Sequence, residues 1–100
     1  MNPYLNQLHS ILQNHLQGHP SRVYLFGSMA TGRFRDGSDC DVGIEPLREL
    51  PAGLLASLRE RLEESTIPFP IDVVDLSSTS AAFHEQVKKD GKLWITTHGA

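Results

Sequence analysis

The fold is decided by the stretch between residues 27 and 41, Gly27-Ser28-Met29-Ala30-Thr31-Gly32-Arg33-Phe34-Arg35-Asp36-Gly37-Ser38-Asp39-Cys40-Asp41. The segment before it, 22–26, is rich in β-branched and aromatic side chains, which is typical of a buried strand. From residue 39 to residue 45, apolar and polar side chains alternate, which indicates a second strand with one buried face. Between them we expect a short helical turn at 28–31 and a tight turn at 36–37. The sequence therefore predicts two neighbouring strands, paired antiparallel or within a mixed sheet.

The rest of the chain predicts three helices and two further strands. Asn2 can cap a first helix that has Pro3 at its first position and ends between residues 18 and 20. Leucines at three-and-four spacing predict a second helix around residues 54–62. A third strand is expected at 71–76, a last helix from the hydroxyl-rich segment 77–80 to about residue 89, and an edge strand at 92–96. This order favours the α/β (α+β) class, with a small mixed sheet flanked by helices.

The composition fits one small domain over residues 1–100. Apolar residues make up 39% of the chain and charged residues 21%, so the chain can bury one modest core. The net charge of −3 argues against direct binding of nucleic acid, which needs a basic stripe. Cys40 is the only cysteine, so no internal disulfide is possible, and no apolar stretch reaches the roughly 20 residues of a membrane span. We therefore expect a cytoplasmic domain without a membrane partner.

Carboxylates occupy the starts of two predicted strands. Side chains alternate across a strand, so Asp39 and Asp41 should project to one face, about 6.6 Å apart along the backbone. In the third strand, Asp72 and Asp75 lie on opposite faces, so only one of them can join the first pair. We favour Asp72 because it lies at the beginning of its strand, where a site can open to solvent, and Asp75 is the alternative.

Three neighbouring carboxylates repel one another and favour a cation among them. Each close pair costs about 1 kcal/mol in water and several-fold more at a lower effective dielectric. Ligand sets made only of oxygen select hard cations, of which Mg²⁺ is the usual partner of phosphates. Two such ions could activate an attacking hydroxyl and stabilise a leaving pyrophosphate. We therefore predict Asp39, Asp41 and Asp72 as catalytic and metal-binding residues of a nucleotidyl-transfer site.

The turn after the first strand has the features of a phosphate-binding loop. Gly27 lacks a Cβ and lets the backbone approach a phosphate, and Ser28 with the amides of the following turn can donate hydrogen bonds to it. Arg33 and Arg35 lie in the loop that follows, within reach of phosphate charge. Ser38, just before the acidic strand, is a weaker candidate for the nucleotide-binding set.

Each of these features alone is commonly structural. A Gly-Ser turn, an Asp-x-Asp pair or a single strand aspartate usually has no ligand, and it is their joint spacing that favours a site. The histidines are interpreted as ordinary surface residues, and Cys40 as a buried, inert thiol. Trp94, with Phe83 and Val87, is expected to belong to the core or to a hydrophobic edge for a partner.

The stretch 27–41 resembles the signature of the DNA polymerase β-type nucleotidyltransferase superfamily, and the small size resembles its minimal nucleotidyltransferase (MNT) branch. The resemblance implies that Asp39, Asp41 and Asp72 bind two Mg²⁺ ions and that Gly27 and Ser28 hold the triphosphate of ATP. Thr31 departs from the pattern, because many relatives have arginine there. A phosphate contact is then lost, or Arg33 or Arg35 supplies it.

The resemblance also implies a partner. Minimal nucleotidyltransferases of prokaryotes are often encoded beside a HEPN-domain ribonuclease (HepT-like) and neutralise this toxin by transferring AMP from ATP to one of its tyrosines, as type VII-like antitoxins. Two alternatives stay open: a non-enzymatic antitoxin that acts by contact alone, and a subunit of a small-molecule nucleotidyltransferase of the aminoglycoside-modifying kind. The acceptor residue, the nucleotide preference and the oligomeric state are not encoded in these motifs.

Overall fold

The computed structural model describes residues 3–27 and 39–99. Its elements, in chain order, are α1 (Pro3–Leu16), β1 (Ser21–Phe26), β2 (Cys40–Pro46), α2 (Leu54–Glu63), β3 (Ile71–Asp75), the 3₁₀ turn η2 (Leu76–Ser78), α3 (Ala81–Asp90) and β4 (Lys92–Thr97). These helices and strands lie where the sequence predicts them, and the mixed α/β class is confirmed. The expected cap at Asn2 and the helical turn at 28–31 lie outside the described residues.

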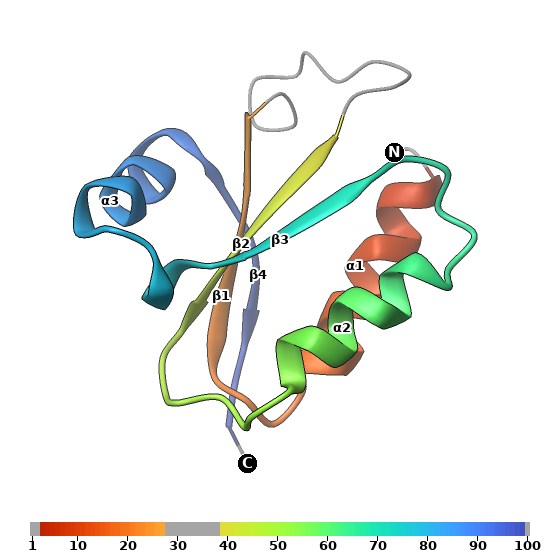
Figure 1. The fold of residues 1–100 in the computed structure, drawn as a ribbon, viewed down its shortest axis with the longest axis horizontal. Coiled ribbons are helices and arrows are strands. Elements are labelled where there is room, and N and C mark those ends of the chain that lie inside the picture. The colour runs from red at the N-terminus through yellow and green to blue at the C-terminus, as the bar shows by residue number, and fades with distance from the viewer. Residues whose placement is uncertain (1–2, 28–38, 100) are drawn as a thin grey trace.

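The strands form one mixed sheet in the order β3-β2-β1-β4 (Figure 1). β1 pairs antiparallel with both β2 and β4, whereas β2 and β3 run parallel. The parallel pair is possible because α2 forms the crossover connection between its two strands. In Figure 1, α1 and α2 cover one face of the sheet and α3 lies against the other.

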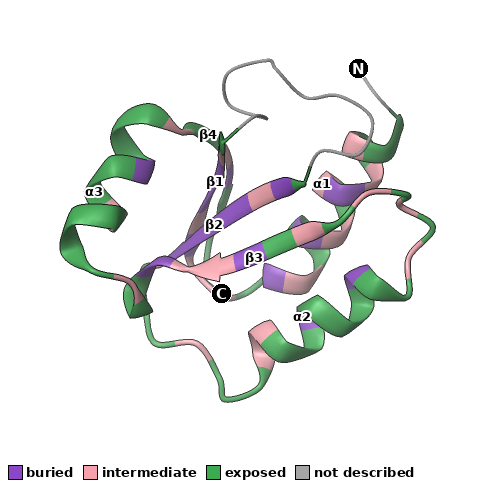
Figure 2. Cartoon of the chain, turned by 45° about the horizontal axis from the view of Figure 1, so that its top comes forward, coloured by how far each residue is buried: buried purple, intermediate pink, exposed green. Residues whose placement is uncertain are grey.

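The larger part of the core lies between the sheet and the helices α1 and α2. Leu8, Leu12 and Leu16 of α1 are spaced on one helical face and are fully buried, because this face packs against the sheet. The strand residues that share this core include Val23, Leu25, Cys40, Val42, Ile44 and Val73. Figure 2 shows how burial concentrates on the strands, above all on β2, while the outer helical faces are exposed.

A β-bulge in β4 determines the face of the sheet on which Trp94 packs. Val23 pairs with Ile95 and Tyr24 pairs with Leu93, so Trp94 is the extra residue between two registers. A bulge turns two successive side chains to one face, and Trp94 accordingly packs with the α1–α2 core and against the ring of His9. The prediction that Trp94 belongs to the core is confirmed, and this core is the one under α1 and α2, whereas Val87 belongs to the cluster on the other face.

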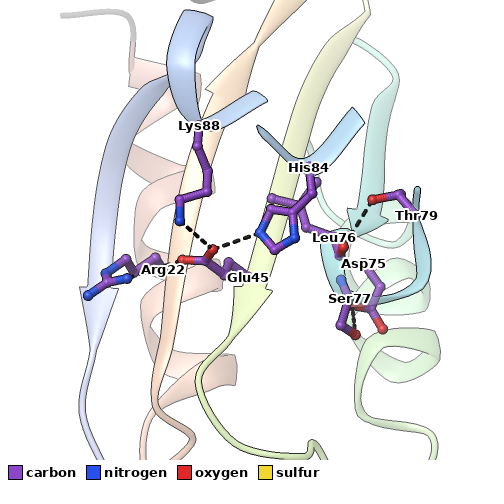
Figure 3. A network of polar contacts seen from close by, with 8 residues as sticks. All are labelled: Arg22, Glu45, Asp75, Leu76, Ser77, Thr79, His84 and Lys88. Atoms are coloured by element: carbon purple, nitrogen blue, oxygen red, sulfur yellow. Dashed lines mark hydrogen bonds and ion pairs between the residues drawn. The ribbon is translucent and has the colours of Figure 1, made fainter. Parts of the chain in front are cut away.

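An ionic cluster joins α3 to the opposite face of the sheet (Figure 3). Glu45 of β2 is only 7% exposed, and its carboxylate accepts from Arg22 Nη1 at 3.3 Å, His84 Nε2 at 2.7 Å and Lys88 Nζ at 3.3 Å. Burial alone would raise the pKa of Glu45, but the hydrogen bonds from these three partners outweigh it and the pKa is lowered. The prediction that His84 is an ordinary surface histidine is wrong.

No helix of the described residues is long and apolar enough to cross a membrane.

Glu45→Gln should destabilise the fold by about 1–3 kcal/mol near neutral pH, the usual value of hydrogen bonds to a charged group. A lowered folded-state pKa stabilises the protein above the ordinary value of 4.5, and this stabilisation is lost as the pH falls through the folded-state pKa. The difference between wild type and variant should therefore shrink in acid. Urea unfolding at several pH values measures it, with exposed Glu85→Gln on α3, the helix that carries His84 and Lys88, as the matched control. Equal stability of wild type and Glu45→Gln at pH 7 would contradict the role given to the cluster.

Candidate active site

The sheet places Phe26, Asp41 and Asp72 in one row across three strands. Phe26 of β1 is the register partner of Asp41, and Asp41 is the register partner of Asp72. Register partners on neighbouring strands project to the same face, which here is the face that α3 covers farther along. Asp39 directly precedes β2 and is exposed. The structure thus places Asp72 beside Asp41, and Asp39 just before Cys40, at the ends of β2 and β3 nearest Gly27.

The charges of Asp72 and Asp39 act electrostatically on the carboxyl group of Asp41. The pKa of Asp41 is raised above its ordinary value of 3.8, first by burial, then by the charge of Asp72 and then by the charge of Asp39. Burial and like charges both disfavour the ionised form. The negative charge of Asp41 is therefore held at a cost in free energy.

The donor set fits a hard cation in its chemistry. All three candidate ligands are carboxylate oxygens, and their mutual repulsion is the condition that a divalent cation relieves. Within residues 3–27 and 39–99, no three acidic, histidine or cysteine side chains are gathered closely enough to enclose a metal ion. An ion held here would therefore draw the aspartates closer and take further oxygen ligands from water or phosphate, as Mg²⁺ commonly does.

Gly27 has a left-handed backbone conformation and lies against Asp41. Its φ of 68° lies in the left-handed region, and a Cβ at this position would overlap Asp41 Oδ2. Only glycine adopts this conformation at little cost while leaving room for the carboxylate. Its predicted contact with phosphate stays a prediction, and Ser28, Arg33, Arg35 and Ser38, together with Thr31, lie outside the described residues.

The alternative third carboxylate, Asp75, has another role in the structure (Figure 3). Its side chain caps η2, accepting from Ser77 N at 2.9 Å, Ser77 Oγ at 2.6 Å and Ser78 Oγ at 3.2 Å. Its register partner is Ile44, at the opposite end of the strand pair from Asp72. The structure therefore places Asp72, and not Asp75, beside Asp41.

Cys40 lies between the two aspartates in sequence but on the other face of β2. It is fully buried among the side chains of the α1–α2 core. Burial, and then the charge of Asp41, raise the pKa of this thiol to about 12. A thiol that stays protonated at neutral pH is a poor nucleophile, as the interpretation of Cys40 as inert requires.

A large open cavity lies away from Asp39, Asp41 and Asp72. It has a volume of about 1000 Å³ and is lined by the segment 46–51, one side of α2, the end of β3 and η2. Of the described residues predicted for the site, Gly27, Asp39, Asp41 and Asp72 do not line it, whereas the alternative carboxylate Asp75 does. We assign the active site to Asp39, Asp41 and Asp72 and not to this cavity. Neighbouring carboxylates with a shifted pKa indicate a functional site, whereas the volume of a cavity alone does not.

Residues 6–98 match the model of the family described as polymerase beta, nucleotidyltransferase. The chain therefore belongs to the polymerase beta-type nucleotidyltransferase family.

One relative and two solved structures show which members of this family the chain is similar to. Over 69 residues the chain is 36% identical to a Haemophilus influenzae protein named Probable protein adenylyltransferase MntA, an alignment that covers 67% of this chain and 59% of the relative. The chain thus spans less than two thirds of that relative's length. A chain in the crystal structure of a toxin-antitoxin with AMP-PNP is 27% identical, with a TM-score of 0.69 and coverage of 95% of this chain and 73% of the other. A chain from the complex of a tri-AMPylated Shewanella oneidensis HEPN toxin with MNT antitoxin is 25% identical, with a TM-score of 0.64 and coverage of 97% and 71%.

Gly27→Ala should destabilise the protein more than a left-handed alanine does elsewhere in the chain. The matched control is Gly18→Ala, because Gly18 has a φ of 83° but nothing within 4 Å of a Cβ. Backbone strain alone costs about 1–2 kcal/mol, and Gly27→Ala adds the overlap with Asp41. Urea unfolding of both variants measures the difference. Equal losses would show that the contact with Asp41 is unimportant.

Asp41→Asn should raise the melting temperature at neutral pH in the presence of a chelator. A carboxyl whose folded-state pKa is raised destabilises the fold at pH values above that pKa, and this penalty disappears below its ordinary value of 3.8. The gain should therefore be largest near pH 7 and vanish toward pH 3. Thermal melts at both pH values test it. Asp75→Asn serves as the control and should give no gain, because it weakens a cap; a lower melting temperature for Asp41→Asn at pH 7 would contradict the acidic cluster.

Proposed function

We propose that this chain is a Mg²⁺-dependent nucleotidyltransferase that transfers AMP from ATP to a tyrosine of a HEPN-domain toxin and so neutralises it. The observation that carries the proposal is the register of Asp41 beside Asp72, with Asp39 acting on the same carboxylate, in a chain of the polymerase beta-type family. The relatives supply the partner and the donor: one is named an adenylyltransferase, one structure contains AMP-PNP, and one pairs MNT antitoxin with an AMPylated HEPN toxin.

The chain's own residues would act by binding the metal ion and by positioning the phosphates of ATP. Asp39, Asp41 and Asp72 would bind Mg²⁺ through their oxygens, which relieves the repulsion at Asp41. The ion, when bound, supplies charge neutralisation at the phosphates and polarises the reacting oxygens. Gly27 lets the backbone come close to Asp41, so that a phosphate bound against the Gly27 backbone would lie beside this carboxylate.

The reaction is a substitution at the α-phosphorus of ATP. The tyrosine hydroxyl oxygen forms a bond to this phosphorus while the bond to the bridging oxygen of the β-phosphate breaks. Pyrophosphate leaves, and the hydroxyl proton passes to solvent. The product is a tyrosine that carries AMP through a phosphodiester bond, which changes a neutral side chain on the toxin into an anionic one.

The test is to incubate the purified protein with Mg²⁺, α-labelled ATP and the HEPN-domain protein of the same genome, and then to measure intact masses and map peptides of both chains. We expect an AMP-sized increment on a tyrosine of the HEPN protein, and none when Mg²⁺ is chelated. Asp39→Asn should lower the rate at least about 100-fold, because several kcal/mol of transition-state stabilisation correspond to that factor or more.

Asp75→Asn is the matched control for the loss of a carboxylate, and it should retain transfer because Asp75 serves as a cap. Complex formation without any mass increment would overturn the enzymatic proposal in favour of neutralisation by contact. Normal labelling by Asp39→Asn would show that the catalytic assignment is wrong.

A further inference from the structure

An aromatic pair, Phe26 and Phe83, lies beside the acidic row that Asp41 and Asp72 form. Phe26 is the strand neighbour of Asp41, and its ring lies across Gly43, where a Cβ would meet Phe26 Cε1 at 3.3 Å and Leu76 Cδ1 at 3.1 Å. The absence of a side chain at Gly43 therefore makes the room that the Phe26 ring occupies. The ring packs against the apolar cluster of Tyr24, Leu76 and Val87.

Phe83 brings a second ring to the same place from α3. It meets Phe26 edge-on, with ring centroids 5.9 Å apart and an interplanar angle of 83°. Its backbone N–H donates to Ser80 Oγ at 3.1 Å, which fixes the first turn of the helix, and the ionic cluster around Glu45 holds the next residue, His84. Phe83 is nevertheless 39% exposed. A large apolar ring that is fixed in position yet partly open to solvent has surface available for a planar ligand.

We propose that Phe83 is the residue on which the adenine base of the nucleotide stacks. This inference rests on the proposed function, because the aspartates fix only the phosphate end of ATP. The base lies one ribose away from the α-phosphate, and Phe83 reaches the acidic row through a single intervening residue, Phe26. A purine offers the flat π-face that such a ring binds. Phe83 is thus a positioning residue for the nucleoside and takes no part in the bond changes.

The proposal separates binding of the base from binding of the phosphates. Stacking of a base on an aromatic side chain is lost on substitution by alanine at a cost of roughly five-fold to a hundred-fold in affinity. Phe83→Ala should therefore weaken MgATP by a factor in this range and leave inorganic Mg-tripolyphosphate, which has no base, unchanged. Phe83→Leu should behave like Phe83→Ala, because it keeps apolar bulk without the π-face, and Phe83→Trp should retain the affinity for MgATP.

The experiment is isothermal titration of the full chain and these variants with MgATP and with Mg-tripolyphosphate, after thermal melts that verify folding. Leu93→Ala is the matched control, since Leu93 is also an exposed apolar residue, 50% accessible, and lies on β4. Unchanged MgATP affinity in Phe83→Ala, or full affinity in Phe83→Leu, would overturn the stacking role and leave the proposed function intact. Equal weakening of both ligands would also overturn it. Failure of the wild type to bind either ligand would overturn the proposed function together with this inference.

Discussion

The parallel pairing of β2 with β3 is the constraint on which the rest of the structure depends. It places Asp72 beside Asp41 although the two residues are far apart in sequence, and it requires a crossover helix, which α2 supplies. α2 then buries Leu58 and Leu62 against the sheet, so the same connection that aligns the carboxylates also completes the core. Arg59 of this helix donates to the carbonyl of Val73 at 2.9 Å, which occupies one of the free acceptors that an edge strand otherwise exposes.

The two faces of the sheet carry different tasks. The face toward α1 and α2 is apolar and holds most of the buried side chains. The face toward α3 has a small apolar cluster of Tyr24, Leu76 and Val87, with an acidic row at one end and the ionic cluster of Glu45 at the other. Hydrophobic burial on this second face is limited, so charged hydrogen bonds contribute to holding α3 in place.

Local patterns in the sequence were sufficient to predict the elements, because alternation and three-and-four spacing reflect burial directly. They also predicted which face each aspartate occupies, since this follows from the period of a strand. They could not predict the ionic cluster, because Glu45 is separated from each of its partners by 23 or more residues. Nor could they predict the bulge that turns Trp94 toward α1, because the pairing of β4 with β1 decides it. Long-range register, and not local propensity, sets these features.

Asp41 and Glu45 lie on the same strand, but their surroundings shift their pKa values in opposite directions. They are four residues apart on the same face of β2, and both are partly or largely buried. Glu45 accepts hydrogen bonds from three side chains of β1 and α3, and its pKa is lowered, whereas the described charges that act on Asp41 come from two further aspartates and its pKa is raised. Within residues 3–27 and 39–99, Glu45 is surrounded by hydrogen-bond donors and Asp41 has acidic neighbours, so the negative charge of Asp41 costs stability. That loss is understandable if the missing positive charge comes from a ligand, because such strain is what a functional site retains and a purely structural strand does not.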